Sequence, residues 1–464
     1  MEMEFGRAVD CLAPAERPAL PVRSVRPEKL DTVLEALDPA AAAFARSSGF
    51  TAASGQIVLL PGGDGLAGAL LGLGDDRSPW PYGALPFGLP EDTAWRLAPG
   101  DFDIERAVLG FCLGAYQYTR LLKPKRAPAL LAGADAYAAA LAAARAAWLA
   151  RDLINTPANL LGPAELADAA LALASRYGAE SRFISGEALA AEYPAIAAVG
   201  GGAERGPVVA AFTWSGTGAG PEAKLISLCG KGVCFDTGGY DLKPPAAMLR
   251  MKKDMGGAAL MLALASAIME RDLPVRLAVR IGCVENMVSA RAMRPLDVLR
   301  TRRGLTVEVG NTDAEGRLIL CDLIAEASDE GPEVLIDAAT LTGAARVALG
   351  PDLPALFVND DALAEAMLRA ADSACDPLWR LPLHAGYGDW LASPVADLNN
   401  VSSKPFAGAI VAGLFLQRFV APGTRWAHLD TYAWNDATRP GRPEGGEALG
   451  LRALLTFVTE SILG

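Results

Sequence analysis

Short apolar runs alternate with longer amphipathic runs along most of the chain. The apolar runs predict strands at residues 208–214, 224–228, 275–284, 305–309, 334–338 and 355–358. Apolar positions at helical spacing predict helices at residues 256–270, 317–327 and 362–372. This alternation is typical of a mostly parallel sheet covered by helices.

The segment before these elements has a different pattern. Residues 135–153 are rich in Ala, the best helix former, and predict one long helix that ends at the Asn-Thr-Pro-Ala-Asn segment, residues 155–159. We therefore expect an α/β protein in three parts. A small N-terminal α/β domain would span residues 1–130 and a linker helix residues 131–155. A larger α/β domain, with a mixed, mostly parallel sheet flanked by helices, would span residues 156–464.

Composition and charge limit the class of protein. The chain has 464 residues, of which 52% are hydrophobic and 21% charged, as expected for a well-packed globular protein. Its net charge is −12. Because binding to nucleic acid relies on Lys and Arg that neutralise phosphates, DNA is an unexpected partner.

Cysteine usage and the N-terminus indicate the compartment. The seven cysteines are scattered and form no CxxC pair, which is typical of free thiols in a reducing compartment. Cys229, Cys234 and Cys321 lie near the polar motifs, but their apolar neighbours indicate buried structural thiols and we assign them no metal. Residues 1–5 lack an apolar signal core, and the longest apolar runs are too short or too interrupted to span a bilayer. We expect a cytoplasmic protein without a membrane partner.

Histidine is scarce. His384 and His428 are the two histidines of the chain, which excludes HExxH-type sites and other metal sites built on several histidines. His428 lies in a short apolar run, so we interpret it as a core or strand-end histidine.

The eight residues 311–318 read Asn-Thr-Asp-Ala-Glu-Gly-Arg-Leu. They connect the predicted strand at 305–309 to the predicted helix at 317–327. Asp313 and Glu315 lie two positions apart, so on an extended segment their carboxylates point to the same side. Crowded carboxylates repel one another unless a cation lies between them, and a divalent metal fits such a place at the carboxyl end of a strand.

A second polar cluster lies upstream, at residues 230–239, with the sequence Gly-Lys-Gly-Val-Cys-Phe-Asp-Thr-Gly-Gly. Its glycines predict tight turns around Lys231 and Asp236. Lys243 and Asp254 follow shortly after. Together the two clusters offer the carboxylates Asp236, Asp254, Asp313 and Glu315 and the cations Lys231, Lys243 and Arg317. Carboxylate-rich sets of this kind suit a pair of metal ions bridged by shared carboxylates.

Each of these residues also has an ordinary structural interpretation. Asp254 could cap the helix predicted to begin at residue 256. Lys243 could be an exposed loop lysine, and Arg317 a surface arginine at the start of a helix. All of these interpretations would have to hold at once, so we favour the metal site.

Several segments closely resemble the leucyl aminopeptidase (cytosol aminopeptidase) family. The matching segments are residues 155–159, 230–239, 243–244, 253–258, 311–318 and 337–344, in the family's order. The octapeptide at 311–318 is the most specific of them. The resemblance covers roughly residues 150–350, whereas residues 1–130 match only in position and size.

The resemblance implies a two-metal aminopeptidase, a hydrolase that removes the N-terminal residue of peptides, with residues 156–464 as its catalytic domain. Lys231, Asp236, Asp254 and Glu315 would hold the tighter metal. Asp236, Asp313 and Glu315 would hold the more exchangeable one, so that Asp236 and Glu315 bridge. Zinc and manganese are the expected ions. Lys231 would have to be neutral to act as a ligand.

The resemblance assigns further roles around the metals. A metal-bridged hydroxide would attack the peptide, Lys243 would stabilise the oxyanion, and a bicarbonate bound by Arg317 would act as general base. Met251, Thr340 and Gly343 would line the pocket of the first side chain and suit an apolar residue. The family further implies a homohexamer, arranged as a dimer of trimers, that serves peptide turnover.

The chain departs from the family pattern in two places. Tyr240 and Asp241 stand where many relatives have small or aliphatic residues, and either shape the entrance or support the structure. Residues 445–450 differ from the pattern common in a region that borders the specificity pocket. The preferred first residue is therefore open.

Two other functions remain as alternatives. One is a dipeptidase, or a hydrolase of another amide with the same metal pair, which competition between dipeptides and longer peptides would separate from an aminopeptidase. The other is a DNA-binding or architectural protein, against which the net charge of −12 weighs.

Overall fold

The structure is a computed structural model that describes residues 9–464, so the predicted signal-free N-terminus at residues 1–5 lies outside the described residues. The chain divides into two compact units. The larger contains Leu149–Trp434 and Gly446–Gly464, and the smaller contains residues 9–148 and Asn435–Gly445. The domain boundaries expected near residues 130 and 155 stay a prediction.

The larger unit is built on an eight-stranded sheet with the order β15-β14-β17-β13-β9-β10-β8-β7. The strands are β7 Glu180–Ser185, β8 Val208–Ser215, β9 Leu225–Asp236, β10 Arg276–Asn286, β13 Val334–Ala339, β14 Ala355–Val358, β15 Trp379–Arg380 and β17 Trp426–Asp430. Its centre, from β17 to β10, is parallel, and β14 and β15 also pair in parallel. The antiparallel pairs are β14 with β17, β10 with β8, and β8 with β7. The predicted fold class, a mixed and mostly parallel sheet with flanking helices, is confirmed.

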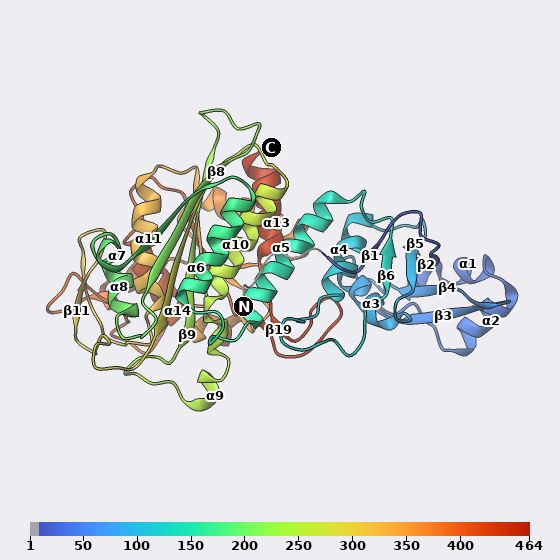
Figure 1. Cartoon of the computed structure of the whole chain (residues 1–464), viewed down its shortest axis with the longest axis horizontal. Coiled ribbons are helices and arrows are strands. Elements are labelled where there is room, and N and C mark those ends of the chain that lie inside the picture. Colours follow the sequence, from blue (N-terminus) through green and yellow to red (C-terminus); the bar gives the residue numbers. More distant parts are fainter. Residues whose placement is uncertain (1–8) are drawn as a thin grey trace. The chain divides into compact units, whose positions relative to one another are not determined.

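Helices cover both faces of this sheet (Figure 1). The helices are α6 Pro163–Arg176, α7 Gly186–Glu192, α8 Pro194–Gly200, α9 Pro245–Met248, α10 Gly256–Glu270, α11 Gly316–Asp329, α12 Gly343–Leu349, α13 Asp361–Ser373, α14 Gly408–Gln417 and α15 Leu451–Phe457. Helices α6, α10 and α15 pack together in one layer, and α8, α11 and α14 form the other. Short 3-10 segments, η3 Met251–Met255 and η4 Ala385–Leu391, and the π-helical η5 Val458–Ile462 complete the unit.

The central strand β9 is longer than its apolar run predicts. The predicted strand stops at residue 228, before the first glycines, but β9 continues to Asp236 because β10 pairs with it along this stretch. Gly230 therefore lies within the strand and not in a turn. A Cβ atom there would lie 2.6 Å from the Cα of Ala258, so the glycine lets α10 pack directly on the sheet.

One predicted strand belongs to another sheet. Residues 305–309 form β12 Thr306–Glu308, which pairs with β11 Val298–Arg300 and β16 Leu398–Asn399 in a separate three-stranded sheet. The loop that follows β12 nevertheless reaches the carboxyl end of β9, because Thr312 donates a hydrogen bond to the carbonyl oxygen of Gly238 at 2.6 Å.

The smaller unit has a six-stranded sheet with the order β1-β6-β5-β2-β4-β3. Its strands are β1 Leu12–Ala13, β2 Leu20–Val25, β3 Ile57–Gly62, β4 Gly65–Gly72, β5 Ala94–Leu97 and β6 Leu130–Ala132, and its helices are η1 Pro27–Lys29, α1 Leu30–Glu35, α2 Pro39–Ser47, η2 Trp80–Ala84, α3 Leu85–Gly88 and α4 Ile104–Gly114. Helix α5 Ala138–Asn155 corresponds to the predicted Ala-rich helix. The short strands β18 Trp434–Asn435 and β19 Gly445–Gly446 bound the later segment of this unit. Within residues 9–464, no helix combines the length and the apolar character needed to cross a bilayer.

Candidate metal and peptide site

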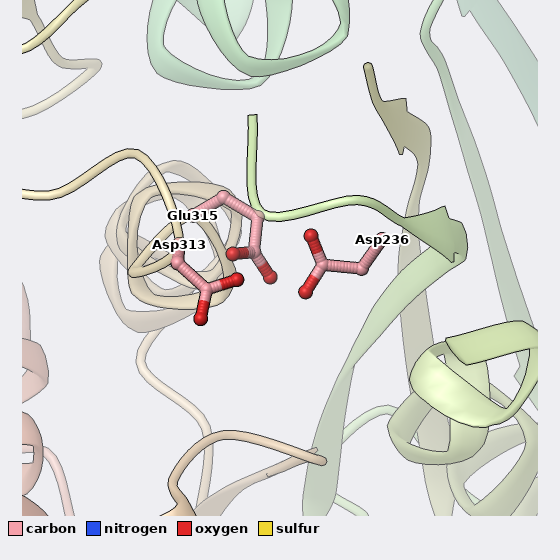
Figure 2. Close-up of side chains that lie close together, drawn as sticks. All are labelled: Asp236, Asp313 and Glu315. Carbon is pink, nitrogen blue, oxygen red and sulfur yellow. The ribbon is translucent and has the colours of Figure 1, made fainter. Parts of the chain in front are cut away.

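The polar clusters of the sequence meet at the carboxyl end of the parallel strands. Lys231 lies within β9 and Asp236 is its last residue, whereas Asp313 and Glu315 lie in the loop before α11. Each of Asp236, Asp313 and Glu315 offers a carboxylate oxygen, and these oxygens all lie within 4.8 Å of one another. Figure 2 shows the three carboxylates facing a common space, with Asp236 opposite the other two.

Lys231 is the buried cation of this cluster. Its Nζ lies 2.8 Å from Asp254 Oδ2 and 2.8 Å from Glu315 Oε1, and it donates a hydrogen bond to the carbonyl oxygen of Thr340 at 2.8 Å. Burial opposes its charge, but Asp254 and Glu315 outweigh burial and hold the pKa of Lys231 above its ordinary value. Gly316 makes room for this side chain, because a Cβ atom there would lie 2.9 Å from Nζ.

Lys243 occupies the open side of the same cluster. Its Nζ lies 2.8 Å from Asp236 Oδ2 and also contacts Asp313 Oδ1. The lysine is partly exposed and lines the adjoining cavity. The interpretation of Lys243 as an exposed loop lysine therefore does not hold, because the side chain is largely buried and paired with two carboxylates.

The carboxylates crowd one another in spite of the two lysines. Burial, and next the charge of Asp236, raise the pKa of Glu315 to about 8 and that of Asp313 to about 6. Burial also raises the pKa of Asp254. Glu315 Oε2 is buried and has no hydrogen-bond partner among the described residues. Convergent carboxylates with an unused buried oxygen are the donor set that a divalent cation would neutralise, so the residues fit a metal centre.

Asp254 does not cap helix α10. It lies in η3, the N-cap residue of α10 is Met255, and no side chain caps the helix. Instead Asp254 Oδ1 accepts a hydrogen bond from Thr340 Oγ1 at 2.6 Å. Both Asp254 and Thr340 are therefore held beside Lys231.

Arg317 is buried, at 7% exposure, and is not the surface residue of its ordinary interpretation. Its Nη1 donates to the carbonyl oxygen of Asn400 at 2.6 Å, and its Nε has no partner among residues 9–464. Burial lowers the pKa of Arg317 to about 10 although Glu315 favours its charge. A buried guanidinium that lines the cavity and keeps an unused N–H group can bind a small anion.

Sequence reasoning missed several residues that support the ligands. Asn286, the last residue of β10, donates to Asp236 Oδ1 at 2.9 Å and to the carbonyl oxygen of Thr312 at 3.1 Å. Asn400 accepts hydrogen bonds from the backbone of Gly310 and donates one to Asn311. A polar residue that ends a buried apolar strand, as Asn286 does, is a signal that the sequence offered.

A cavity of about 790 Å³ opens beside the cluster. It is lined by every residue to which the resemblance assigns a role at the site, namely Lys231, Asp236, Lys243, Met251, Asp254, Asp313, Glu315, Arg317, Thr340 and Gly343. The cavity therefore joins the carboxylate cluster to the candidate side-chain pocket.

His428 lies outside this cavity. It is fully buried, and its Nδ1 lies 2.5 Å from Asp337 Oδ1, while the indole N–H of Trp426 donates to Asp337 Oδ2 at 2.6 Å. The interpretation as a core histidine is confirmed.

Comparison with known proteins gives the same family for both parts of the chain. Residues 148–455 match the family described as "Cytosol aminopeptidase family, catalytic domain", and residues 20–133 match "M17 aminopeptidase, N-terminal domain". The chain is 43% identical over 397 residues to a probable cytosol aminopeptidase from Desulfovibrio desulfuricans, and the match covers 81% of this chain and 78% of the relative.

Solved structures of similar proteins indicate the same family. The cytosol aminopeptidase from Coxiella burnetii superimposes with a TM-score of 0.93 at 44% identity, over 98% of this chain and 100% of that chain. The bottromycin maturation enzyme BotP in complex with Mn has a TM-score of 0.84 at 34% identity, over 95% of this chain and 98% of its own. The resemblance found in the sequence is confirmed.

Proposed function

The chain belongs to the cytosol aminopeptidase family and is a metallopeptidase that acts as an aminopeptidase, and on this premise we propose how its residues carry out the reaction. The substrate would be a peptide with a free α-amino group. The single observation that supports the proposal most is the convergence of Asp236, Asp313 and Glu315, whose carboxylate oxygens lie within 4.8 Å of one another at the wall of a large cavity.

Two divalent ions would bind here, as is typical of the family. Lys231, Asp236, Asp254 and Glu315 would hold one, and Asp236, Asp313 and Glu315 the other. When bound, the ions would bind the α-amino group, lower the pKa of a water molecule and neutralise the tetrahedral intermediate. Lys231 forms ion pairs with Asp254 and Glu315, which favour its charged form. A nearby metal cation would have to lower the pKa of Lys231 before the neutral amine could act as a ligand. Manganese or zinc would serve, and the manganese complex of BotP supports the former.

Lys243 would stabilise the oxyanion. Its ammonium group is held by Asp236 and Asp313 at the edge of the cavity, so it would donate to the carbonyl oxygen of the scissile bond as negative charge develops. Arg317 would hold a small anion with its unused N–H group. Bicarbonate, when bound there, would supply a general base, which fits a site without a nearby histidine.

Met251, Thr340 and Gly343 would border the first side chain of the peptide. They line the cavity next to Lys231, and Met251 and the Thr340 methyl group offer apolar surface. We therefore propose that apolar first residues are accepted. We further propose a homohexamer, arranged as a dimer of trimers, that works in the cytoplasm in peptide turnover, with residues 131–155 as the linker before the catalytic domain.

The test is hydrolysis of aminoacyl p-nitroanilides and dipeptides by metal-stripped protein, before and after addition of manganese or zinc. We expect metal to restore cleavage, Asp313→Ala to lose it, and acetylation of the α-amino group to block it. Asp372→Ala, an exposed carboxylate on α13, is the matched control and should behave as the wild type. Metal binding without cleavage of any substrate that carries a free α-amino group would contradict the proposal.

A further inference from the structure

One wall of the cavity carries three cationic side chains around a single aromatic ring. Lys253 Nζ lies 4.6 Å from the centroid of the Tyr432 ring, and the guanidinium carbon of Arg346 lies 5.0 Å from it. Arg250 Nη1 lies 3.5 Å from the Tyr432 hydroxyl. All four residues line the cavity. We call Arg250, Lys253 and Arg346 the cationic wall.

Lys253 is the unusual member of this wall. Its residue is only 5% exposed, yet among residues 9–464 its ammonium group has no carboxylate within ion-pair distance and no hydrogen-bond acceptor. A ring face compensates a buried charge only in part. An anion from outside the chain, bound in the cavity, would therefore stabilise this buried ammonium group.

Neighbouring carboxylates are already committed to other groups. Asp254 binds Lys231 and accepts from Thr340. Asp430 accepts hydrogen bonds from the backbone of Leu341 at 3.0 Å and from the hydroxyl of Thr342 at 2.6 Å. Neither is within ion-pair distance of Lys253 among the described residues. Lys253 and Arg346 thus keep their positive charge toward the cavity.

The cationic wall lies on the same elements as the candidate pocket of the first side chain. Lys253 follows Met251 in η3, and Arg346 follows Gly343 in α12. A peptide whose first side chain passes Met251 would therefore bring the end of that side chain toward the cationic wall.

We propose that the cationic wall binds a carboxylate of the peptide substrate, which extends the accepted first residues from apolar ones to Glu and Asp. This inference rests on the proposed aminopeptidase function. Arg and Lys are the side chains that bind carboxylates most strongly, and the methylene groups of a Glu side chain suit the apolar surface of Met251. The C-terminal carboxylate of a dipeptide has the same chemistry and is the second source.

The experiment compares substrates that differ only in one charge, using the metal-loaded full chain. Glutamyl and glutaminyl p-nitroanilides report on the first side chain, and Leu-Gly and Leu-glycinamide report on the C-terminus. For the wild type we expect kcat/KM to be higher for glutamyl than for glutaminyl p-nitroanilide. In Arg346→Gln this ratio should fall about tenfold, the loss of one charge-assisted hydrogen bond.

Arg346 is exposed, so its replacement does not disturb the core. The matched control is Arg369→Gln, another exposed arginine, on α13, for which the glutamyl to glutaminyl ratio should stay at the wild-type value. Lys253→Gln provides a second variant with the same expected direction. A change in the Leu-Gly to Leu-glycinamide ratio alone would support the cationic wall with the C-terminus as its ligand.

The outcomes separate this inference from the function on which it rests. Suppose that leucyl p-nitroanilide is cleaved, but that the glutamyl to glutaminyl ratio and the Leu-Gly to Leu-glycinamide ratio are both unchanged in Arg346→Gln and Lys253→Gln. The carboxylate inference is then overturned, and the aminopeptidase function stands. If no substrate with a free α-amino group is cleaved, the proposed function is overturned, and the inference with it.

Discussion

Asp241 and Thr312 hold the two ligand-bearing loops together through three hydrogen bonds. Asp241 Oδ2 accepts from the backbone N–H of Thr312 at 2.7 Å and from its hydroxyl at 3.1 Å, and the backbone N–H of Asp241 donates to Thr312 Oγ1 at 2.9 Å. Asp236 precedes the first loop and Asp313 follows Thr312 directly. The contact therefore fixes the distance between two candidate metal ligands that are far apart in the sequence.

Asp241→Ala is expected to weaken metal binding about tenfold or more, because groups that orient ligands are worth that much in other metal sites. The residue itself is exposed, so the fold should persist. Titration of the metal-stripped protein with manganese measures the effect. Asp241→Asn keeps one acceptor for the Thr312 N–H and should lie between the wild type and Asp241→Ala. Equal manganese affinity in all three proteins would show that the contact has no part in the site.

Metal binding is expected to stabilise the fold, and Glu315 should carry much of that effect. A ligand at a hundredfold excess over its Kd adds about 3 kcal/mol to the free energy of unfolding. Thermal unfolding of the wild type should therefore shift upward on addition of manganese, and the shift should shrink in Glu315→Gln, which removes the charge and one ligand oxygen. Glu365→Gln on the exposed face of α13 serves as the control. A wild-type Tm that does not respond to manganese or zinc would contradict the metal site.

Much of the fold was predictable because several strands of the eight-stranded sheet are buried on both faces along most of their length. Such strands read as continuous apolar runs, and β8, β10, β13 and β14 begin within about one residue of their predictions. The extension of β9 through Gly230 was not predictable, because glycine ordinarily indicates a turn and the strand is completed by pairing with β10. The place of β12 in a separate sheet likewise depends on pairing with β11 and β16, which the local pattern does not contain.

The candidate site, too, was predictable only in part. The residues that line the cavity and carry recognisable chemistry stand in two dense motifs, so their types and spacing pointed to a metal centre. The residues that hold these side chains in place lie outside those motifs. Asn286 and Asn400, which hydrogen-bond to the ligand-bearing segments, come from other parts of the chain. In the same way, Lys253 and Arg346 of the cationic wall are distant in sequence and meet at the ring of Tyr432. Only the three-dimensional arrangement brings such residues together.

Stability is expected to depend on pH through Glu326. Burial alone would raise the pKa of Glu326, but Arg280, the Tyr193 hydroxyl and Arg302 outweigh burial and hold it below its ordinary value. Arg280 Nε donates to Glu326 Oε2 at 2.7 Å, and the Tyr193 hydroxyl at 2.5 Å. Because the pKa is lower in the folded state, the stabilisation is complete above the unfolded value of 4.5 and is lost as pH falls through the folded value.

Glu326→Gln should therefore lower the free energy of unfolding by about 1–3 kcal/mol at pH 7, where the wild type carries a paired carboxylate. The difference between the two proteins should shrink as the pH falls below 4.5. Urea unfolding at several pH values measures it. Glu333→Gln removes the partly exposed partner of Arg425 and should cost less than about 1 kcal/mol. A difference for Glu326→Gln that stays constant with pH would mean that its charge does not stabilise the fold.

Gly230→Ala is expected to disturb both the core and the metal site, because the new Cβ atom would lie 2.6 Å from the Cα of Ala258 on helix α10. The atom nearest to this Cβ belongs to the backbone of α10, which cannot give way as the side chain of Ile281 on the other side could, so α10 must move outward at a cost of about 1–3 kcal/mol. Helix α10 begins directly after η3, which carries Asp254, so manganese affinity should fall together with stability. Gly206→Ala is the control, since nothing lies within 4 Å of a Cβ atom at that position. Urea unfolding and manganese titration of the two variants check the argument, and an unchanged midpoint in Gly230→Ala would mean that the sheet and α10 can separate without loss.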